Sequence, residues 1–481
     1  MLHRELLVAG HLFGGSCDQS IGKEPVRSPW DGRVVGTAAE AGPAELETAL
    51  ASAHEAFPEW SRSSVRERQR LLRRVSQAFQ DRSEELAQLL VDEIGKPISF
   101  ARAEVARAAL TFSLAADELT RPSGTLLPAG FDPRGDNVTI RTQSFPVGVV
   151  LCITPYNWPF NLAAHKVAPA LAAGNTVILK APSLAPLSGL TLGQILLEAG
   201  CPDGVVQCVH CPNGLAEKMV TDDRVAMISF TGSRTVGRHI QKLVPHKRVA
   251  LELGGDAYVL VGQDADLDNV VARVVPSAYG YAGQVCISAQ HLVCHESVRD
   301  ELQEMLVAAT DSCPTGDPAD ETTVCGPLIH SAAADRVVEW TEEAEAGGAQ
   351  VLTGGHRVGN TVWPTLVADV PPTSRLAREE VFGPALTLSS FTTWQEAFAR
   401  VNGSQFGLQA SLFTRDLDVV EEAFQTLRVG GVVVNDAPSL RFDNMPYGGE
   451  KESGDTREGV AAAMREMSTE RVLVTRHRPV T

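Results

Sequence analysis

The first part of the chain carries apolar residues at helical spacing between residues 43 and 120. The clearest run is Leu71, Leu72, Val75 and Phe79. This period is typical of amphipathic helices that pack one face on a core. Gly95 to Pro97 interrupts the pattern, because glycine and proline end helices, and it resumes from Ala101 to Leu119. We therefore predict several helices before residue 120, and a strand-like segment from Pro122 to Thr142, where Val138 and Ile140 alternate with polar residues.

From Gly148 onward, short apolar runs alternate with helical segments. The predicted strands are Val149–Ile153, Asn175–Leu179, Val205–Val209 and Ala226–Phe230, and the predicted helices between them are Leu162–Ala172 and Leu187–Ala199. Such alternation predicts an α/β fold with a parallel sheet covered by helices on both faces. A second α/β segment is predicted from Leu251 to Val434. A last strand, Arg471–Thr475, would be an exposed edge unless it pairs with another sheet.

Length and charge narrow the class of protein. The chain has 481 residues, 44% of them apolar, which exceeds one hydrophobic core and predicts two or three domains. A net charge of -17 opposes binding to nucleic acid. The longest stretch without a charged residue, Thr142 to His165, contains several prolines, so we expect no membrane span. Met1 to Gly10 carries charged residues and no apolar segment, so we expect no secretory signal.

The chain contains nine cysteines, an odd number, and they are scattered along its length. This usage predicts reduced thiols and a cytoplasmic protein. Cys208 and Cys211 form a CxxC pair, but no second ligand pair follows at the spacing of a zinc site, and the run from Gly204 to Cys211 is itself strand-like. We therefore expect no metal site.

The segment from Phe230 to Gly237 is a candidate nucleotide site. The glycine-rich GxGxxG fingerprint of dinucleotide-binding folds is absent, but Gly232 and Ser233 follow a strand and open a helix. The free N–H groups of a helix start bind anions, and Ser233 can cap them. A plain strand–turn–helix with a serine cap is the alternative interpretation of this segment.

Further segments place reactive or hydrogen-bonding side chains, such as a cysteine, a carboxylate or an asparagine, close to glycine or proline. They are Ile153-Thr-Pro-Tyr-Asn-Trp-Pro-Phe-Asn161, Leu251-Glu-Leu-Gly-Gly255, Gly283-Gln-Val-Cys-Ile-Ser-Ala-Gln290, Glu379-Glu-Val-Phe-Gly-Pro384, Met445-Pro-Tyr-Gly-Gly449 and Ser453-Gly454. In their order and spacing, the sequence closely resembles the aldehyde dehydrogenase superfamily over essentially the whole chain. The resemblance implies oxidation of an aldehyde to a carboxylic acid with NAD or NADP.

The resemblance implies three catalytic residues. Cys286 matches the nucleophile that forms a thiohemiacetal and then a thioester. The Asn157 amide and the Cys286 N–H match the donors to the oxyanion, each worth about 10²–10³ in rate. Glu252 matches the general base that activates water for hydrolysis. Their structural alternatives are a buried cysteine, a turn asparagine and a carboxylate capping the diglycine.

The resemblance also implies a set of cofactor contacts. Lys180, at the end of a predicted strand, matches the residue that holds the adenosine ribose, and Glu380 and Phe382 match contacts to the nicotinamide ribose and ring. The alternatives are a solvated lysine, a surface carboxylate and a core aromatic residue. The remaining predicted cofactor-binding residues are Thr154, Pro155, Ser183, Gly232, Ser233 and Gly254.

Two positions depart from the family pattern. Many NAD-preferring relatives carry a glutamate three residues after the lysine, whereas this chain has Ser183. A carboxylate there would repel a 2′-phosphate and a serine would not, so we expect NADP to be used at least as well as NAD. Asp256 stands where lysine or asparagine is usual, and nothing in the sequence explains it.

By resemblance, the fold has a Rossmann-type cofactor-binding domain (residues 1–120 and 143–248) and an α/β catalytic domain (249–435). Residues 121–142 and 436–481 would form a β oligomerisation arm and C-terminal segment. In that arrangement the tail strand pairs across subunits and gives a homodimer or homotetramer.

The substrate is predicted to be a short aldehyde with an anionic far end, such as a semialdehyde, a lactaldehyde-like or a phosphorylated aldehyde. The segment 435–446 resembles the loop at the substrate mouth and contains Arg441, which would bind carboxylate or phosphate; Arg102 or Arg107 would add a second cation. Alternatively, Arg441 pairs with Asp436 or Asp443. Trp158 and Val285, beside the catalytic residues, are apolar and favour an aromatic or aliphatic aldehyde instead.

Two other functions stay open at this stage. A relative that passes the acyl group to coenzyme A would need no water-activating base, and Glu252 argues against it. A non-catalytic protein on this fold would be expected to lose Cys286, Asn157 or Glu252, and all three are present.

Overall fold

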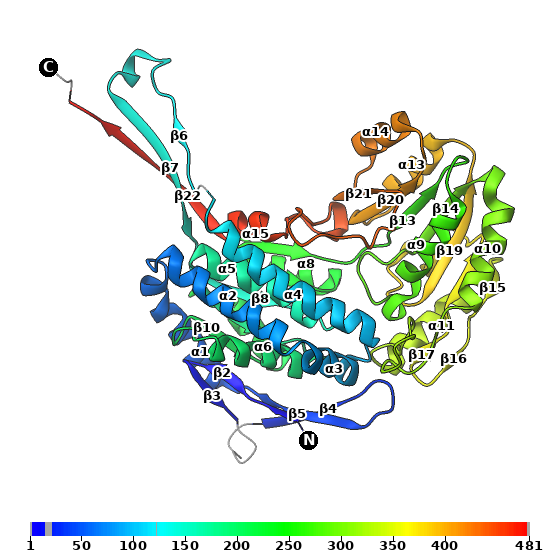
Figure 1. Cartoon of the computed structure of the whole chain (residues 1–481), viewed down its shortest axis with the longest axis horizontal. Helices are drawn as coiled ribbons and strands as arrows, with labels where there is room; N and C mark the ends of the chain where they lie inside the picture. Colours follow the sequence, from blue (N-terminus) through cyan, green and yellow to red (C-terminus); the bar gives the residue numbers. More distant parts are fainter. Residues whose placement is uncertain (1, 15–21, 122, 479–481) are drawn as a thin grey trace.

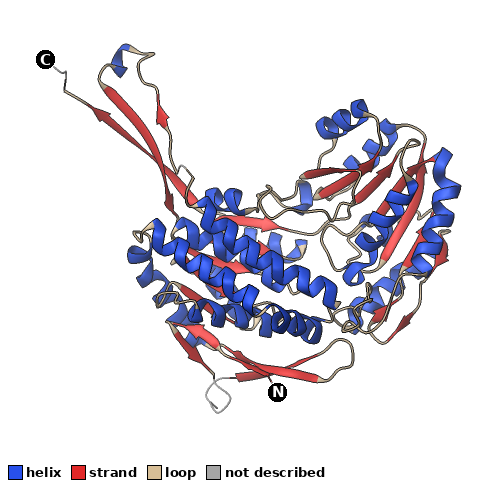
Figure 2. Cartoon of the chain, in the orientation of Figure 1, coloured by secondary structure: helices blue, strands red, loops and turns tan. Residues whose placement is uncertain are grey.

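The computed structural model describes residues 2–14, 22–121 and 123–478, and it consists of two large sheets with their helices and an extended arm (Figures 1 and 2). Each large sheet has seven strands. The mixed α/β architecture confirms the predicted fold class. Among the described residues, we find no helix with the length and hydropathy needed to cross a bilayer.

The first sheet has the strand order β12-β11-β8-β9-β10-β2-β3. Its strands are β2 (Leu6–Val8), β3 (His11–Phe13), β8 (Val149–Ile153), β9 (Thr176–Lys180), β10 (Val206–Val209), β11 (Val225–Thr231) and β12 (Arg248–Glu252). Strands β8 to β12 are parallel, and the predicted ones among them are confirmed to within a residue. The chain runs from β8 to β10 in one direction and returns beside β8 with β11. Ligands bind at the carboxyl ends of strands where the order reverses in this way.

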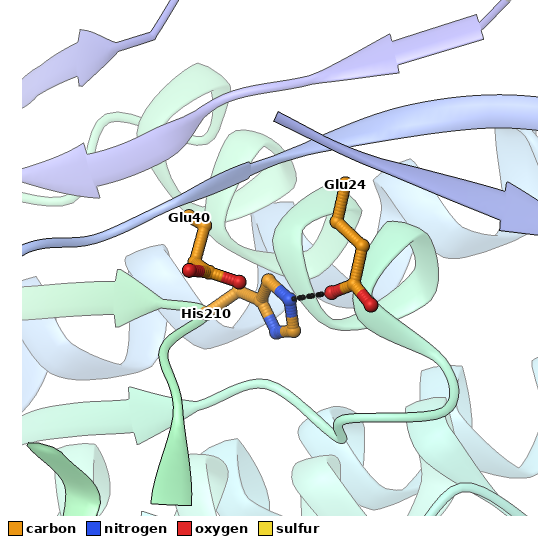
Figure 3. Close-up of side chains that lie close together, drawn as sticks. All are labelled: Glu24, Glu40 and His210. Carbon is orange, nitrogen blue, oxygen red and sulfur yellow. Dashed lines mark hydrogen bonds and ion pairs between the residues drawn. The ribbon is translucent and has the colours of Figure 1, made fainter. Parts of the chain in front are cut away.

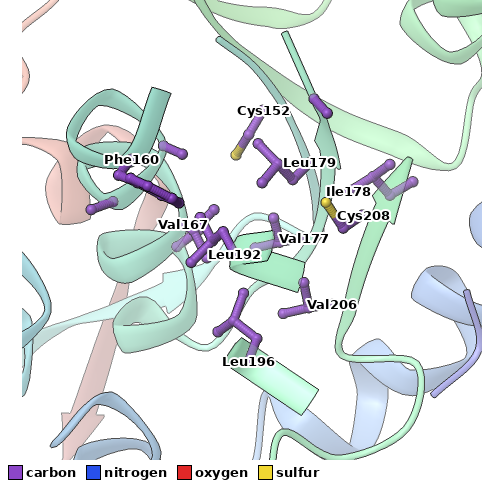
Figure 4. Close-up of a cluster of buried hydrophobic side chains, with 14 of the residues drawn as sticks. Cys152, Phe160, Val167, Val177, Ile178, Leu179, Leu192, Leu196, Val206 and Cys208 are labelled. Atoms are coloured by element: carbon purple, nitrogen blue, oxygen red, sulfur yellow. The ribbon is translucent and has the colours of Figure 1, made fainter. Parts of the chain in front are cut away.

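Helices cover both faces of this sheet (Figure 1). They are α1 (Pro43–Trp60), α2 (Val65–Asp81), α3 (Ser83–Ile94), α4 (Ile98–Glu118), α5 (Pro159–Ala173), α6 (Pro186–Glu198), α7 (Asn213–Thr221), α8 (Arg234–Leu243) and α15 (Val460–Glu466). The predicted break at Gly95 is present, since its left-handed backbone (φ 65°) ends α3. Phe160, Val177 and Leu192 belong to the continuous core between sheet and helices (Figure 4).

The second sheet has the order β15-β18-β19-β14-β13-β20-β21. Its strands are β13 (Tyr258–Val261), β14 (His291–His295), β15 (Gln350–Thr353), β18 (Thr365–Ala368), β19 (Ala385–Phe391), β20 (Gln409–Phe413) and β21 (Gly431–Val434). Its helices are α9 (Leu267–Tyr279), α10 (Arg299–Asp311), α11 (Ser331–Ala346), α12 (Arg375–Arg378), α13 (Trp394–Gly403) and α14 (Leu417–Thr426). The predicted domain boundary at 248/249 falls inside β12, which hydrogen-bonds to β11 and therefore belongs to the first sheet.

The arm projects from the first sheet and contains β6 (Leu126–Leu127), β7 (Val138–Pro146) and β22 (Ser468–Arg476) (Figure 1). The tail strand β22 pairs antiparallel with β7 over its whole length, so one of its edges is satisfied within the chain. Its apolar residues Val472, Leu473 and Val474 are 59%, 48% and 61% exposed. Smaller sheets join β1 (Leu2–Arg4), β4 (Gly22–Arg27) and β5 (Val34–Glu40), and β16 (Arg357–Val358) with β17 (Thr361–Val362).

Candidate active site

Two cavities meet at Cys286, which lies on the loop between α9 and β14. A cavity of about 430 Å³ opens at the carboxyl ends of the first sheet, and a smaller one of about 180 Å³ lies between α4, α5 and the segment 439–447. The Cys286 side chain lines both. A molecule in either cavity therefore has access to the same sulfur.

The larger cavity collects the predicted cofactor-binding residues from the ends of β8, β9, β11 and β12 and from the loop before β19. All nine line it: Thr154, Pro155, Lys180, Ser183, Gly232, Ser233, Gly254, Glu380 and Phe382. Residues that the sequence analysis missed include Arg336 and His330. They lie at the start of α11, and no local motif marked them.

One end of the larger cavity is polar and faces α8. The Lys180 ammonium donates to the Ser183 hydroxyl over 2.6 Å, and burial lowers the pKa of Lys180. Ser233 caps α8, whose first-turn N–H groups add positive potential. This combination suits a phosphate or a ribose hydroxyl.

The other end is shaped by Glu380. Its carboxylate accepts a hydrogen bond from the Gly255 N–H over 3.0 Å, and burial raises its pKa to about 7. A Cβ on Gly254 would lie 2.2 Å from the Glu380 carboxylate. Gly254 therefore leaves room for the carboxylate, while a Cβ on Gly255 would lie 2.7 Å from the Cys286 carbonyl oxygen.

The groups around Cys286 can stabilise an oxyanion. The Asn157 Nδ2 donates to the Gln284 carbonyl over 2.8 Å, which ties the strand-end loop of β8 to the cysteine loop and leaves the second Nδ2 hydrogen available. The Cys286 N–H donates no hydrogen bond to any residue the structure describes. Tyr281 and Ala282, just upstream, have left-handed backbones (φ 52° and 54°), which packing must hold in place.

The Cys286 thiol is half-buried. Its Sγ lies 3.1 Å from the Tyr447 hydroxyl, and burial raises its pKa to about 11. The thiol is therefore protonated at neutral pH and needs a base before it can attack. Tyr447 lies in the Met445–Gly449 motif, to which the sequence analysis assigned no role, and only the fold reveals this contact.

Glu252 is the carboxylate that the sequence analysis predicted as the general base. It ends β12 in a buried position, and one of its carboxylate oxygens, Oε2, has no hydrogen-bond partner among the residues that the structure describes. Burial and the nearby Glu458 carboxylate raise its pKa well above the ordinary value. The pKa of Glu458 is lowered instead, despite its burial, by Lys166 and Arg441. Such a divergence of two neighbouring carboxyl groups is typical of acid–base sites.

The smaller cavity carries the predicted substrate residues Trp158, Val285 and Arg441. The Arg441 guanidinium is buried, lies 3.3 Å from the Glu458 carboxylate and stacks 3.7 Å from the Tyr447 ring centroid. Neither suggested partner binds it: Asp443 accepts two hydrogen bonds from Arg107, and Asp436 lies beside Arg273.

Of the two candidates for a second cation, the structure places Arg107 at the smaller cavity and Arg102 away from it. Arg107 lines the smaller cavity and lies over the Trp158 ring. Arg102 is on the exposed face of α4 and pairs with Glu84 and Glu321. Five residues separate them on the same helix, which turns them to different faces.

The side chains that could hold a metal ion lie elsewhere. Glu24, Glu40 and His210 place ligand-type atoms within 4.8 Å of one another (Figure 3). The His210 Nε2 lies 2.9 Å from the Glu24 carboxylate, so an ordinary hydrogen bond accounts for their approach. The Cys208 thiol of the CxxC pair donates to the Gly189 carbonyl in the core.

Comparisons with known proteins agree with this geometry. The model of the aldehyde dehydrogenase family matches residues 17–473. The chain is 39% identical over 431 residues to a 3-sulfolactaldehyde dehydrogenase from Priestia aryabhattai, covering 89% of this chain and 90% of the relative.

Solved structures are similar over nearly the whole chain. Aldehyde dehydrogenase 21 from Physcomitrella patens, in complex with the reaction product succinate, superimposes with a TM-score of 0.96 at 37% identity and covers 98% of both chains. The NADP-dependent glyceraldehyde-3-phosphate dehydrogenase from Bacillus halodurans C-125, complexed with NADP, has a TM-score of 0.95 at 32% identity, with 99% of this chain and 100% of the other covered.

The contact between Gly254 and Glu380 gives a first prediction. Gly254→Ala places a methyl group 2.2 Å from the Glu380 carboxylate, so we expect Glu380 to be displaced and the Kd for NADP to rise at least about tenfold, or ~1.4 kcal/mol. Fluorescence titration measures it. Gly403→Ala is the matched control, because a Cβ there meets nothing within 4 Å. Unchanged NADP affinity in Gly254→Ala would contradict the assignment of Glu380 to the cofactor cavity.

Proposed function

Since the chain belongs to the aldehyde dehydrogenase family, we propose that it oxidises a short aldehyde with an anionic far end to the carboxylic acid, through a thioester on Cys286. The observation that carries the proposal is the position of Cys286 between a cofactor-sized cavity and a small cavity that holds two arginines. Enzymes of this family use NAD or NADP, and the lining of the larger cavity fits that group, because a carboxylate, an ammonium and a helix start can bind ribose hydroxyls and phosphates.

Acylation begins with proton transfer from Cys286. The Glu252 carboxylate, whose raised pKa makes it a stronger base, takes the thiol proton, and the thiolate sulfur bonds to the aldehyde carbon. The carbonyl electron pair moves to the oxygen, where Asn157 Nδ2 and the Cys286 N–H donate to it. Bound NAD or NADP supplies the acceptor for the departing hydride. The acyl group then remains on the Cys286 sulfur as a thioester.

Hydrolysis of the thioester uses Glu252 a second time. Glu252 first releases the thiol proton to solvent. Its carboxylate then takes a proton from water as the water oxygen bonds to the acyl carbon, and the Cys286 sulfur leaves with its electron pair. The free Oε2 of Glu252 is available for that water. Transfer to coenzyme A would need no such base, so the arrangement supports hydrolysis.

An anionic substrate is supported by the cations of the smaller cavity. Arg107 and Arg441 both line it, and each has hydrogen-bonding capacity beyond its own acidic partner. Guanidinium groups bind carboxylate, sulfonate and phosphate strongly where water is scarce. The volume of about 180 Å³ limits the substrate to a few carbon atoms.

An aromatic or aliphatic aldehyde is the second candidate. Apart from the arginines, the smaller cavity is lined largely by apolar side chains, including Phe100, Trp158 and Leu162. The similarity to a 3-sulfolactaldehyde dehydrogenase and to a structure holding succinate favours the anionic substrate over this one.

NADP is proposed as the preferred cofactor. Ser183 bonds to Lys180 and brings no negative charge to the polar end of the cavity. The ammonium and the hydroxyl together suit a 2′-phosphate.

The quaternary structure is proposed to be a homodimer or homotetramer. Residues of the first sheet, with α1 to α8, would form the cofactor-binding domain and the second sheet the catalytic domain. The arm would pair β22 with a second copy, since its outer edge and three successive apolar side chains are exposed.

The roles of Cys286 and Glu252 predict different kinetics for two variants. With an excess of NADP and aldehyde, Glu252→Gln should form NADPH much more slowly in steady state than wild type, because both the deprotonation of Cys286 and the hydrolysis of the thioester lack their base. Cys286→Ala should form none and still bind NADP. Stopped-flow absorbance and NADP titration measure both. Steady turnover by Cys286→Ala would exclude a thioester on that residue.

Cofactor preference should respond to charge at residue 183. Ser183→Glu places a carboxylate beside the proposed 2′-phosphate site, so we expect kcat/KM for NADP to fall at least about tenfold relative to NAD. Ser183→Ala is the control, since it removes the hydroxyl without adding charge. A wild-type enzyme that uses NAD alone would contradict the proposal.

Substrate charge should be recognised by Arg441. We expect Arg441→Gln to lower kcat/KM for succinic semialdehyde at least about tenfold more than for hexanal, because only the charged substrate loses an ion pair. The ratio of the two substrates cancels any effect of Arg441 on Glu252. Arg273→Gln, on an exposed arginine beside Asp436, is the control. An equal loss for both aldehydes would mean that Arg441 has a structural role only.

A further inference from the structure

A buried ion pair lies behind the active site and takes no part in the proposed chemistry. Lys96, on the turn between α3 and α4, pairs with Glu104 on α4, and both side chains are 0% exposed. Removing two charges from water is costly, and such a pair contributes little net stability compared with apolar residues of similar size. The stability of the core therefore does not explain why this ion pair is present.

The second oxygen of Glu104 caps α5. Its Oε1 accepts the N–H groups of Phe160 and Asn161 over 2.8 and 3.2 Å. These belong to the first turn of α5, which has no side-chain cap of its own. A carboxylate from another helix therefore supplies both the acceptor and the negative charge that a helix start favours.

The Lys96 ammonium contacts the two loops that carry the oxyanion donors. It lies 3.8 Å from the centroid of the Trp158 ring and 4.7 Å from that of Tyr281, both within cation–π range. Trp158 follows Asn157 directly, and Tyr281 begins the left-handed segment that leads to Cys286. One cation thus faces the loop of the amide donor and the loop of the N–H donor.

We propose that Lys96 and Glu104 form a positioning unit that fixes the Asn157 side chain and the Cys286 N–H relative to each other. Glu104 sets the start of α5 and hence the end of the Asn157 loop, while Lys96 holds that loop against the cysteine loop. The hydrogen bond from Asn157 to the Gln284 carbonyl then joins the two loops directly. Oxyanion donors contribute to rate only when their geometry is set before reaction, so the unit acts on acylation and not on cofactor binding.

The inference rests on the proposed function and is tested by the first turnover. The double variant Lys96→Met/Glu104→Gln removes both charges, keeps their volume and leaves an amide oxygen to cap α5. We expect it to fold and to bind NADP like wild type, while the rate constant of the first NADPH formed falls about ten- to a hundredfold in stopped-flow measurements. A folded, NADP-binding double variant with a wild-type rate constant would overturn the proposal.

Two further variants keep the test decisive. Glu104→Asp retains both charges but shortens the side chain by one methylene, so its carboxylate cannot reach Lys96 and α5 together. We expect this variant to slow the first turnover too. A wild-type rate constant for Glu104→Asp would also overturn the proposal. Arg102→Met removes an exposed cation from the same helix and should change nothing. If wild-type enzyme itself forms no NADPH with any aldehyde, the proposed function fails instead.

Discussion

The burial of Glu252 beside Glu458 is the constraint on which the rest of the active site depends. Two carboxyl groups in a water-poor interior cannot both stay ionised unless cations face them. Lys166 and Arg441 supply these cations, and both donate hydrogen bonds to the Glu458 carboxylate. Glu458 therefore keeps its charge, and Glu252 becomes the group with the raised pKa. The same Arg441 lines the smaller cavity, so in the proposed function acid–base chemistry and substrate recognition share one guanidinium.

Much of the fold was predictable because its signals are local. Strands such as Val149–Ile153 are short apolar runs between helices, and Gly95 ends a helix by its own backbone preference. The predicted domain boundary falls inside β12, since only the pairing of β12 with β11 shows which sheet the strand joins. The sequence also predicted the arm. It did not predict that β22 pairs with β7, because the two strands are more than three hundred residues apart in the chain.

The residues of the candidate site also differ in whether the sequence alone could identify them. Cys286, Asn157 and Glu252 stand in motifs whose neighbours mark them, and the fold brings them to one place. Arg102 and Arg107 could not be distinguished by charge alone, because the face of α4 that meets the cavity is fixed by packing. Lys96 and Glu104 gave no signal, since a lysine and a glutamate at helical spacing usually lie on a solvated surface and here are completely buried.

Because two cavities meet at the Cys286 sulfur, the acyl group and the dinucleotide of the proposed reaction would occupy different spaces. The two cavities share the side chains of Cys286 and Leu162, and their other lining residues differ. In the proposed reaction, an acyl group on the sulfur would fill the smaller cavity and leave the larger one open. The spent dinucleotide could then depart, or be exchanged for a fresh one, while the acyl group is still attached, and the acid product would need its own exit on the other side.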